Sequence, residues 1–172
     1  MLSAAMSATL PDMPKRTLVL MRHAKSDWSG DEPDLSRPIA ARGKRQAGEA
    51  GRWLDEHLPE LDFVVTSPAK RARSTWKVAG GECRHRPIVD TDERIYTLEH
   101  DDLFAVLRDI DDDISSALLV GHNPGLDELV TRLSGERVDM VTSSLAVLRF
   151  SGRWRDLRRG GCELVAFGRP PG

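Results

Sequence analysis

The sequence predicts an α/β domain of three stacked layers: a mostly parallel central sheet, helices on both of its faces, and an antiparallel pair of strands at one edge. Two observations lead to this prediction. Short apolar runs of strand length alternate with segments whose apolar residues recur at helical spacing, as in βαβ units. The last two apolar runs, 145–150 and 162–167, are joined by a glycine-containing polar stretch without a helix, which is typical of an antiparallel pair.

The predicted elements follow one another along the chain. Three apolar runs suit buried strands, at residues 17–21, 62–67 and 116–121. A fourth strand is expected just ahead of Glu93. Amphipathic patterns lie between and after these runs. The positions that define one face of each predicted helix are Ile39, Gly43, Ala47, Ala50, Leu54 and Leu58, then Leu103, Val106, Leu107 and Ile110, and then Leu126, Leu129, Val130 and Leu133.

Length and composition limit the organisation of the chain. The 172 residues suit one domain, which we place at 16–172, after a flexible tail at 1–15. Lys plus Arg number 25 against 27 Asp plus Glu, so the net charge of −2 gives no reason to expect binding to nucleic acid or to a membrane. The sequence shows neither a membrane helix nor a secretion signal, and Cys83 and Cys162 are isolated. We therefore expect a cytoplasmic monomer.

Polar residues that suit phosphate binding follow the predicted strands directly. Arg22 and His23 follow the first strand, Arg71 lies shortly after the second, and His122 and Asn123 follow the third. Because parallel strands place their carboxyl ends at one edge of the sheet, we expect these side chains to share a cleft. Guanidinium groups recognise anionic oxygens through paired, planar hydrogen bonds, so the predicted ligand is a phosphoryl group.

Two of these junctions also predict helix N-termini that point into the same cleft. Ser67 and Asn123 are favourable N-cap residues, and each is followed by a proline, Pro68 or Pro124, suited to the first helical position. Free N–H groups and the positive ends of the helix dipoles attract anions. Each residue alone has an ordinary explanation, such as a surface ion pair or a hydrogen-bonded imidazole. Their joint placement at three strand ends favours a functional site.

Several sequence blocks carry a family resemblance. Three blocks resemble the signature blocks of the histidine phosphatase superfamily, which has the phosphoglycerate-mutase-like fold. They are LVLMRHAKSDW (18–28), SPAKRARST (67–75) and VGHNPG (120–125). DLSRPIAARG (34–43) is similar to the bacterial phosphohistidine phosphatase branch of that superfamily. The resemblance runs from about Leu18 to Leu133, most of the predicted domain.

The resemblance implies a phosphatase that forms a covalent phosphohistidine intermediate on His23 and needs no metal or other cofactor. It also implies that Arg22, Arg71 and His122 hold the phosphoryl oxygens. Neighbouring cations lower the pKa of an imidazole and keep it neutral, as a nucleophile must be. The superfamily hallmark Arg-His-Gly is Arg-His-Ala here, and we expect Ala24 to alter the loop only slightly.

Three further residues are candidates for the site. Ser26 and Asn123 are candidate phosphate contacts, although each could instead cap a turn or a helix. Glu93 is the candidate general acid for an alkoxide leaving group, ahead of Asp92, although a carboxylate that caps the following turn is nearly as good an explanation. The sequence predicts that Arg37 is an ordinary surface charge.

The expected substrate is a protein that carries phosphohistidine or another phosphorylated residue. A phosphoramidate needs a general acid less, because imidazole leaves more readily than an alkoxide. The stretch between the helix after Pro68 and Asp92 is too short for a lid, so we expect an open site that admits a phosphorylated side chain. The alternatives are a small-molecule phosphomonoesterase that uses Glu93 as general acid, and a phosphate-binding domain without catalytic activity.

Overall fold

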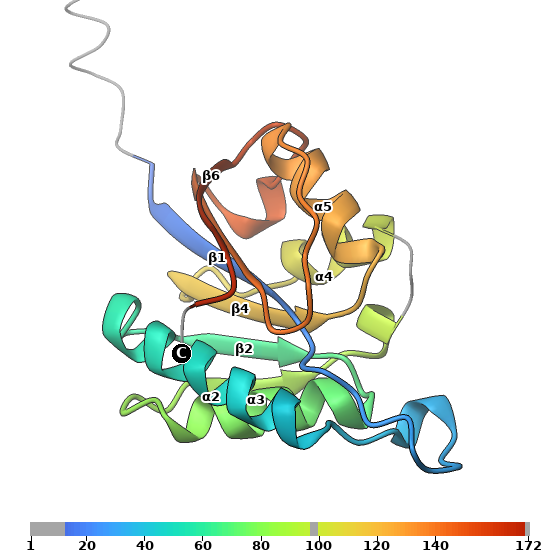
Figure 1. Cartoon of the computed structure of the whole chain (residues 1–172). Coiled ribbons are helices and arrows are strands. Elements are labelled where there is room, and N and C mark those ends of the chain that lie inside the picture. The colour runs from blue at the N-terminus through green and yellow to red at the C-terminus, as the bar shows by residue number, and fades with distance from the viewer. Residues whose placement is uncertain (1–12, 97–99, 171–172) are drawn as a thin grey trace, which may run out of the picture.

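A six-stranded sheet with the strand order β3-β2-β4-β1-β5-β6 forms the centre of the computed structural model (Figure 1). The structure describes residues 13–96 and 100–170. The strands are β1 (Lys15–Arg22), β2 (Phe63–Thr66), β3 (Ile88–Thr91), β4 (Ser116–Gly121), β5 (Leu145–Ser151) and β6 (Glu163–Gly168). The helices are α2 (Ala41–His57), α3 (Lys70–Gly81), α4 (His100–Arg108) and α5 (Gly125–Ser134), with short 3-10 helices η1 (Asp34–Ser36), η2 (Glu93–Tyr96) and η3 (Trp154–Asp156).

The pairing of the strands confirms the predicted mixed sheet. β1, β4, β2 and β3 run parallel to one another. β5 lies antiparallel to β1, and β6 lies antiparallel to β5 at the sheet edge. Lys15, the last residue of the predicted tail, is already the first residue of β1, whereas residues 1–12 of that tail lie outside the described part of the chain.

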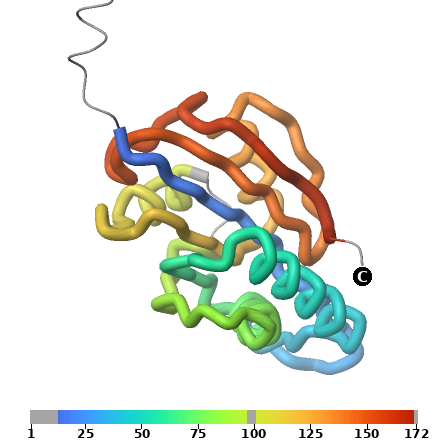
Figure 2. Tube along the Cα trace, turned by 90° about the vertical axis from the view of Figure 1, so that its left-hand side faces the viewer, coloured from blue at the N-terminus to red at the C-terminus, as the bar shows by residue number. Residues whose placement is uncertain are grey.

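The layers follow from the alternation of side chains along β1. Leu18 and Leu20 belong to the apolar cluster formed with α4 and α5. Val19 and Met21 belong to the cluster formed with α2 and α3 on the opposite face. Figure 2 shows α2 and α3 lying beside each other on their side of the sheet. Among the helices of residues 13–96 and 100–170, none is long and apolar enough to cross a membrane.

The structure corrects the predicted starts of two helices. α3 begins at Lys70 after Ala69, whose backbone is still extended, so Ser67 is not the N-cap and Pro68 is not the first helical residue. The hydroxyl of Ser67 instead accepts a hydrogen bond from the Ala69 N–H at 3.2 Å. At α5, Pro124 itself is the N-cap. These residues form turns that lead the chain from a strand into a helix.

Close contact between α2 and α3 predicts a large cost for one small substitution. A Cβ atom at Gly51 would lie 2.2 Å from the backbone oxygen of Ala79, which a side-chain rearrangement cannot relieve. We expect Gly51→Ala to destabilise the fold by about 1–3 kcal/mol, as overpacking does, measured by urea unfolding. The matched control is Gly48→Ala, whose Cβ would lie 3.6 Å from its nearest neighbour and which we expect to be neutral or stabilising. Equal stability of the two variants would contradict this explanation.

Candidate active site

A cavity of about 460 Å³ lies beyond the carboxyl ends of β1 and β4. The structure brings six of the seven predicted site residues to it, and Glu93 is not among the residues that line it. The lining residues are Arg22, His23, Lys25, Ser26, Trp28, Asp34, Arg37, Arg71, Tyr96, His122, Asn123 and Thr142.

The backbone at the end of β1 is held in place by the end of β4 and by the turn that precedes β5. The His23 N–H donates to the Gly121 oxygen at 3.0 Å, at the end of β4. On the other side, the Arg22 N–H donates to the Ser144 oxygen, and the Ser143 N–H donates to the Arg22 oxygen, both at 3.1 Å. Ser143 has a φ of 62°, a left-handed conformation that is uncommon for a residue with a side chain. This turn before β5 therefore fixes the position of Arg22 and His23.

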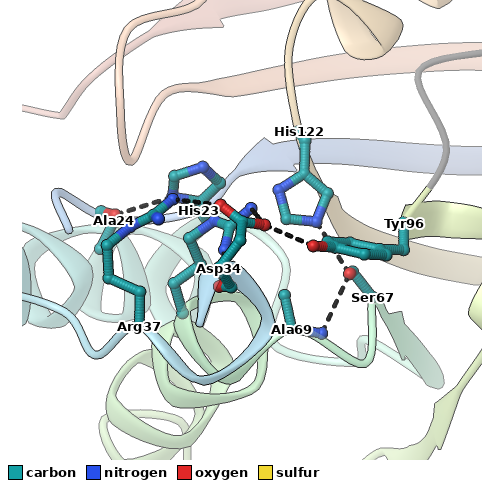
Figure 3. A network of polar contacts seen from close by, with 9 residues as sticks. His23, Ala24, Asp34, Arg37, Ser67, Ala69, Tyr96 and His122 are labelled. Carbon is teal, nitrogen blue, oxygen red and sulfur yellow. Dashed lines mark hydrogen bonds and ion pairs between the residues drawn. The ribbon is translucent and has the colours of Figure 1, made fainter. Parts of the chain in front are cut away.

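The imidazole of His23 is held so that one ring nitrogen is free to react. Its Nδ1 lies 2.8 Å from the backbone oxygen of Ala24 (Figure 3). Because a carbonyl oxygen only accepts, Nδ1 carries the proton, and Nε2 keeps its lone pair. Burial lowers the pKa of His23 to about 4, and the positive charges of Arg71, Arg22 and Arg37 act in the same direction.

This lowered pKa predicts the titration of His23. In an NMR titration of the folded protein, we expect the His23 imidazole to become protonated near pH 4, whereas in the urea-unfolded chain it should do so near pH 6.5. As the pH falls, the unfolded chain therefore binds a proton at His23 before the folded protein does. The contribution of His23 to the stability of the fold is complete above about pH 6.5 and is lost as the pH falls toward 4. A midpoint near 6.5 in the folded protein would contradict the burial of His23 and the arrangement of charges described above.

His122 faces the same cavity from the end of β4. Its ring centroid lies 5.1 Å from that of His23, and its Nε2 lies 2.8 Å from the Ser67 hydroxyl. That hydroxyl already accepts from Ala69, so it can donate its own proton to Nε2 and leave the ring proton of His122 on Nδ1. Nδ1 is buried and has no partner among the described residues. Burial lowers the pKa of His122 to about 3, with His23 and Arg71 as further causes.

The two predicted arginines use their guanidinium groups differently. One terminal nitrogen of Arg22, Nη1, donates to the Met140 backbone oxygen at 2.9 Å, and its Nε is buried without a partner within the described chain. Both terminal nitrogens of Arg71 donate to Asp34, Nη1 to the backbone oxygen at 2.7 Å and Nη2 to Oδ2 at 3.1 Å. Asp34 therefore occupies the edge formed by Nη1 and Nη2 of Arg71, whose Nε, like that of Arg22, is buried without a partner within the described chain.

Asp34 and Tyr96 belong to the site although the sequence did not indicate them. The Tyr96 hydroxyl donates to Oδ2 of Asp34 (Figure 3), and Arg37 pairs with Oδ1 at 2.8 Å. Tyr96, followed by Arg37 and Arg71, lowers the pKa of Asp34 to about 2. The same contact raises the pKa of Tyr96. Asp34 is consequently ionised at neutral pH.

The structure corrects the expectation that Arg37 is a surface charge. The residue is only 9% exposed, because it packs between Asp34 and the ring of Trp28. Its guanidinium carbon lies 3.6 Å from the centre of that ring, while Trp28 itself is 70% exposed. The spacing of Asp34 and Arg37, three residues apart, is the sequence signal that could have indicated this pair.

The remaining candidates differ in their surroundings. The Ser26 hydroxyl is buried at the cavity and has no partner among the described residues. Asn123 uses both ends of its amide for the fold, since Oδ1 accepts from the Asp127 N–H and Nδ2 donates to the Met140 oxygen. Glu93 is exposed and lies outside the cavity lining, because η2 turns Ile95 into the core.

Several positively charged side chains line the cavity. Within residues 13–96 and 100–170, no group of three or more His, Cys, Asp or Glu side chains comes together in a way that could hold a metal ion. Arg22, Arg37 and Arg71 all line the cavity. Guanidinium groups and a neutral imidazole N–H suit the oxygens of a phosphoryl group.

Comparison with known proteins places this site in a family. The model of the histidine phosphatase superfamily (branch 1) matches residues 18–96. A solved structure from Nakamurella multipartitia, described as a phosphohistidine phosphatase of the SixA kind, is 31% identical and covers 94% of this chain and 100% of its own, with a TM-score of 0.84. The chain belongs to the histidine phosphatase superfamily. The resemblance identified in the sequence is thereby confirmed, and this member of the superfamily is a phosphatase.

Two further relatives of this histidine phosphatase extend the comparison. An uncharacterized protein of Mycobacterium tuberculosis, MT1313, is 37% identical over 158 residues, which cover 86% of this chain and 98% of the relative. The tungstate complex of the protein histidine phosphatase SixA is 22% identical, with a TM-score of 0.78 over 90% of this chain and 97% of that one. At that identity the second comparison shows a shared fold.

Proposed function

We propose that this histidine phosphatase removes phosphoryl groups from phosphohistidine side chains of proteins, with His23 as the nucleophile. The observation that carries the proposal is that the cavity has a neutral imidazole as the proposed nucleophile, whereas Asp34 is ionised and Glu93 lies outside the cavity, so neither carboxyl group is placed to act as an acid. Nε2 of His23 has a free lone pair, Asp34 is ionised, and Glu93 lies outside the cavity lining.

The proposed reaction has two steps. Nε2 of His23 attacks the phosphorus, and the P–N bond of the substrate breaks with its electron pair going to the substrate imidazole. That ring leaves as neutral imidazole when its other nitrogen carries a proton. Water then attacks the phosphorus on His23, releases inorganic phosphate and restores the free imidazole. Arg22, Arg71 and the Nδ1–H of His122 would bind the phosphoryl oxygens as charge shifts during each transfer.

The carboxylates of the site favour a phosphoramidate over a phosphomonoester. An alkoxide leaving group needs a proton donor in the transition state, and the pKa of about 2 for Asp34 leaves that carboxyl without a proton at neutral pH. Among the described residues that line the cavity, Asp34 is the only carboxylate. An imidazole leaving group has less need of such an acid. The exposed Trp28 at the cavity also suits a protein surface more than an enclosed metabolite.

A substrate panel tests the proposal. The panel contains a phosphorylated histidine-containing transfer protein, free phosphohistidine, sugar phosphates and nucleotides. We expect kcat/KM to be highest for the phosphorylated protein, by at least about a hundredfold over the phosphomonoesters, or roughly 3 kcal/mol of transition-state stabilisation. Faster turnover of a sugar phosphate or a nucleotide than of the phosphoprotein would overturn the proposal.

Glu93→Gln separates this proposal from the phosphomonoesterase alternative. Because Glu93 is exposed and lies outside the cavity lining, we expect kcat/KM for phosphohistidine protein and for an aryl phosphate to change by less than about twofold. Loss of ester hydrolysis with retained phosphohistidine hydrolysis would instead show that Glu93 is a general acid for esters. The exposed Glu56 provides a matched Glu→Gln control on α2.

A further inference from the structure

The cavity already contains an anion, the side chain of Asp34. Its Oδ2 accepts from Arg71 at 3.1 Å and from the Tyr96 hydroxyl, while its Oδ1 lies 2.8 Å from Arg37. The carboxylate and the backbone oxygen of Asp34 together occupy both terminal nitrogens of Arg71. A phosphoryl group presents its oxygens to a guanidinium in the same forked manner. Nε of Arg71 is buried without a partner among the described residues, but a phosphoryl group can take the edge formed by Nη1 and Nη2 only if Asp34 releases it.

Arg22 provides the contrast within the same cavity. Among the described residues, its guanidinium donates to a neutral backbone oxygen, that of Met140. Its buried Nε has no partner among the described residues, as in Arg71, but no carboxylate is bound to its terminal nitrogens. A phosphoryl group would therefore compete with a neutral carbonyl oxygen for Arg22, but with a negatively charged carboxylate for Arg71.

We propose that Asp34 is an internal anion that competes with the phosphoryl group for Arg71 and thereby weakens the binding of inorganic phosphate. This inference rests on the proposed function, which makes inorganic phosphate the product. A phosphorylated protein can offset the competition from Asp34 through additional contacts with the surface around the cavity, whereas free phosphate cannot. Asp34 would therefore favour exchange of the product for the next phosphorylated substrate.

The segment that carries Asp34 is suited to give up this contact. None of the residues of η1 is buried, so moving η1 removes little apolar surface from the core. Polar contacts hold it instead, through the partners of Asp34 and through Arg37, which lies against Trp28. By contrast, Arg71 is only 6% exposed and belongs to α3, which leaves it little freedom to move away.

Asp34→Asn tests the inference, because asparagine keeps the shape and the accepting oxygen but removes the charge. We expect isothermal titration calorimetry to show at least a tenfold lower Kd for inorganic phosphate, and product inhibition of turnover to strengthen by the same factor. Unchanged or weaker phosphate binding in a folded variant would show that Asp34 merely positions Arg71, and would overturn the inference. The matched control is Asp31→Asn, which makes the same change of charge on an exposed residue outside the cavity lining, and which should alter Kd by less than twofold. An equal effect of both variants would also overturn it.

A second measurement needs no variant. If phosphate displaces Asp34 from Arg71, amide hydrogen exchange in residues 34–37 should become faster when the wild-type protein is saturated with phosphate, although ligands usually slow exchange. Slower or unchanged exchange there would contradict the displacement. Calorimetry and hydrogen exchange are both made without turnover. Their failure is therefore distinguishable from failure of the proposed function, which would appear as missing phosphohistidine hydrolysis in the wild-type enzyme.

Discussion

Replacing His23 by asparagine is expected to lower kcat on a phosphohistidine protein by at least about 10⁴-fold, because the variant has no lone pair on a ring nitrogen with which to attack phosphorus. The remaining groups could still bind the phosphoryl oxygens, so binding of inorganic phosphate should change far less than turnover. This separation of turnover from binding is the signature of a nucleophile, as opposed to a residue that only binds.

Trapping the intermediate provides the direct measurement. Wild-type enzyme mixed with ³²P-labelled phosphoprotein and quenched in alkali should retain the label on its own chain, and His23→Asn should not. The control is His85→Asn, which changes an exposed histidine outside the cavity lining and should leave labelling and kcat as in the wild type. Labelling that persists in His23→Asn would show that another residue accepts the phosphoryl group.

Arg22→Lys is the second variant with a large expected effect, a loss of about 10²–10³-fold in kcat. The guanidinium of Arg22 donates to the Met140 oxygen and still has a buried Nε available for a ligand. A lysine ammonium keeps the charge but cannot present this planar set of donors in two directions. The expected loss therefore arises although the net charge of the cavity is unchanged.

Steady-state kinetics on the phosphoprotein check this expectation. The loss should lie mainly in kcat, because the contact strengthens as charge develops on the phosphoryl oxygens. Arg42→Lys, at an exposed position of α2, is the matched control and should behave as the wild type. A change of less than about threefold in Arg22→Lys would remove Arg22 from the proposed machinery.

The sheet and its helices could be predicted because their signals are local. The apolar run of β1 and the alternation of Leu18 with Val19 reflect burial on both faces of a parallel sheet. The helix face of α5 carries Leu126, Leu129 and Leu133, all of them fully buried as expected. Residues that directly follow a strand were also predictable, because the strand itself fixes where they lie.

Contacts made by the connecting segments could not be predicted in this way. Arg71 and Asp34 are 37 positions apart, and Tyr96 and Asp34 are 62 apart. No periodic pattern encodes the course of the chain that brings them together. Within η2 the direction of each side chain depends on a single short turn, which places Tyr96 rather than Glu93 at the cavity. Sequence reasoning therefore identified the strand-end residues and missed those contributed by the segments between elements.

His23, the proposed nucleophile, and Asp34 lie on segments that the fold holds with different strength. β1 lies between β4 and β5 and is hydrogen-bonded to both, whereas η1 buries no side chain. Laboratory selection for a new phosphorylated target can therefore draw on changes in residues 29–36 at little risk to folding, while the chemistry of His23 is preserved. Diversity libraries confined to that segment should yield mostly folded, reactive proteins with altered preferences.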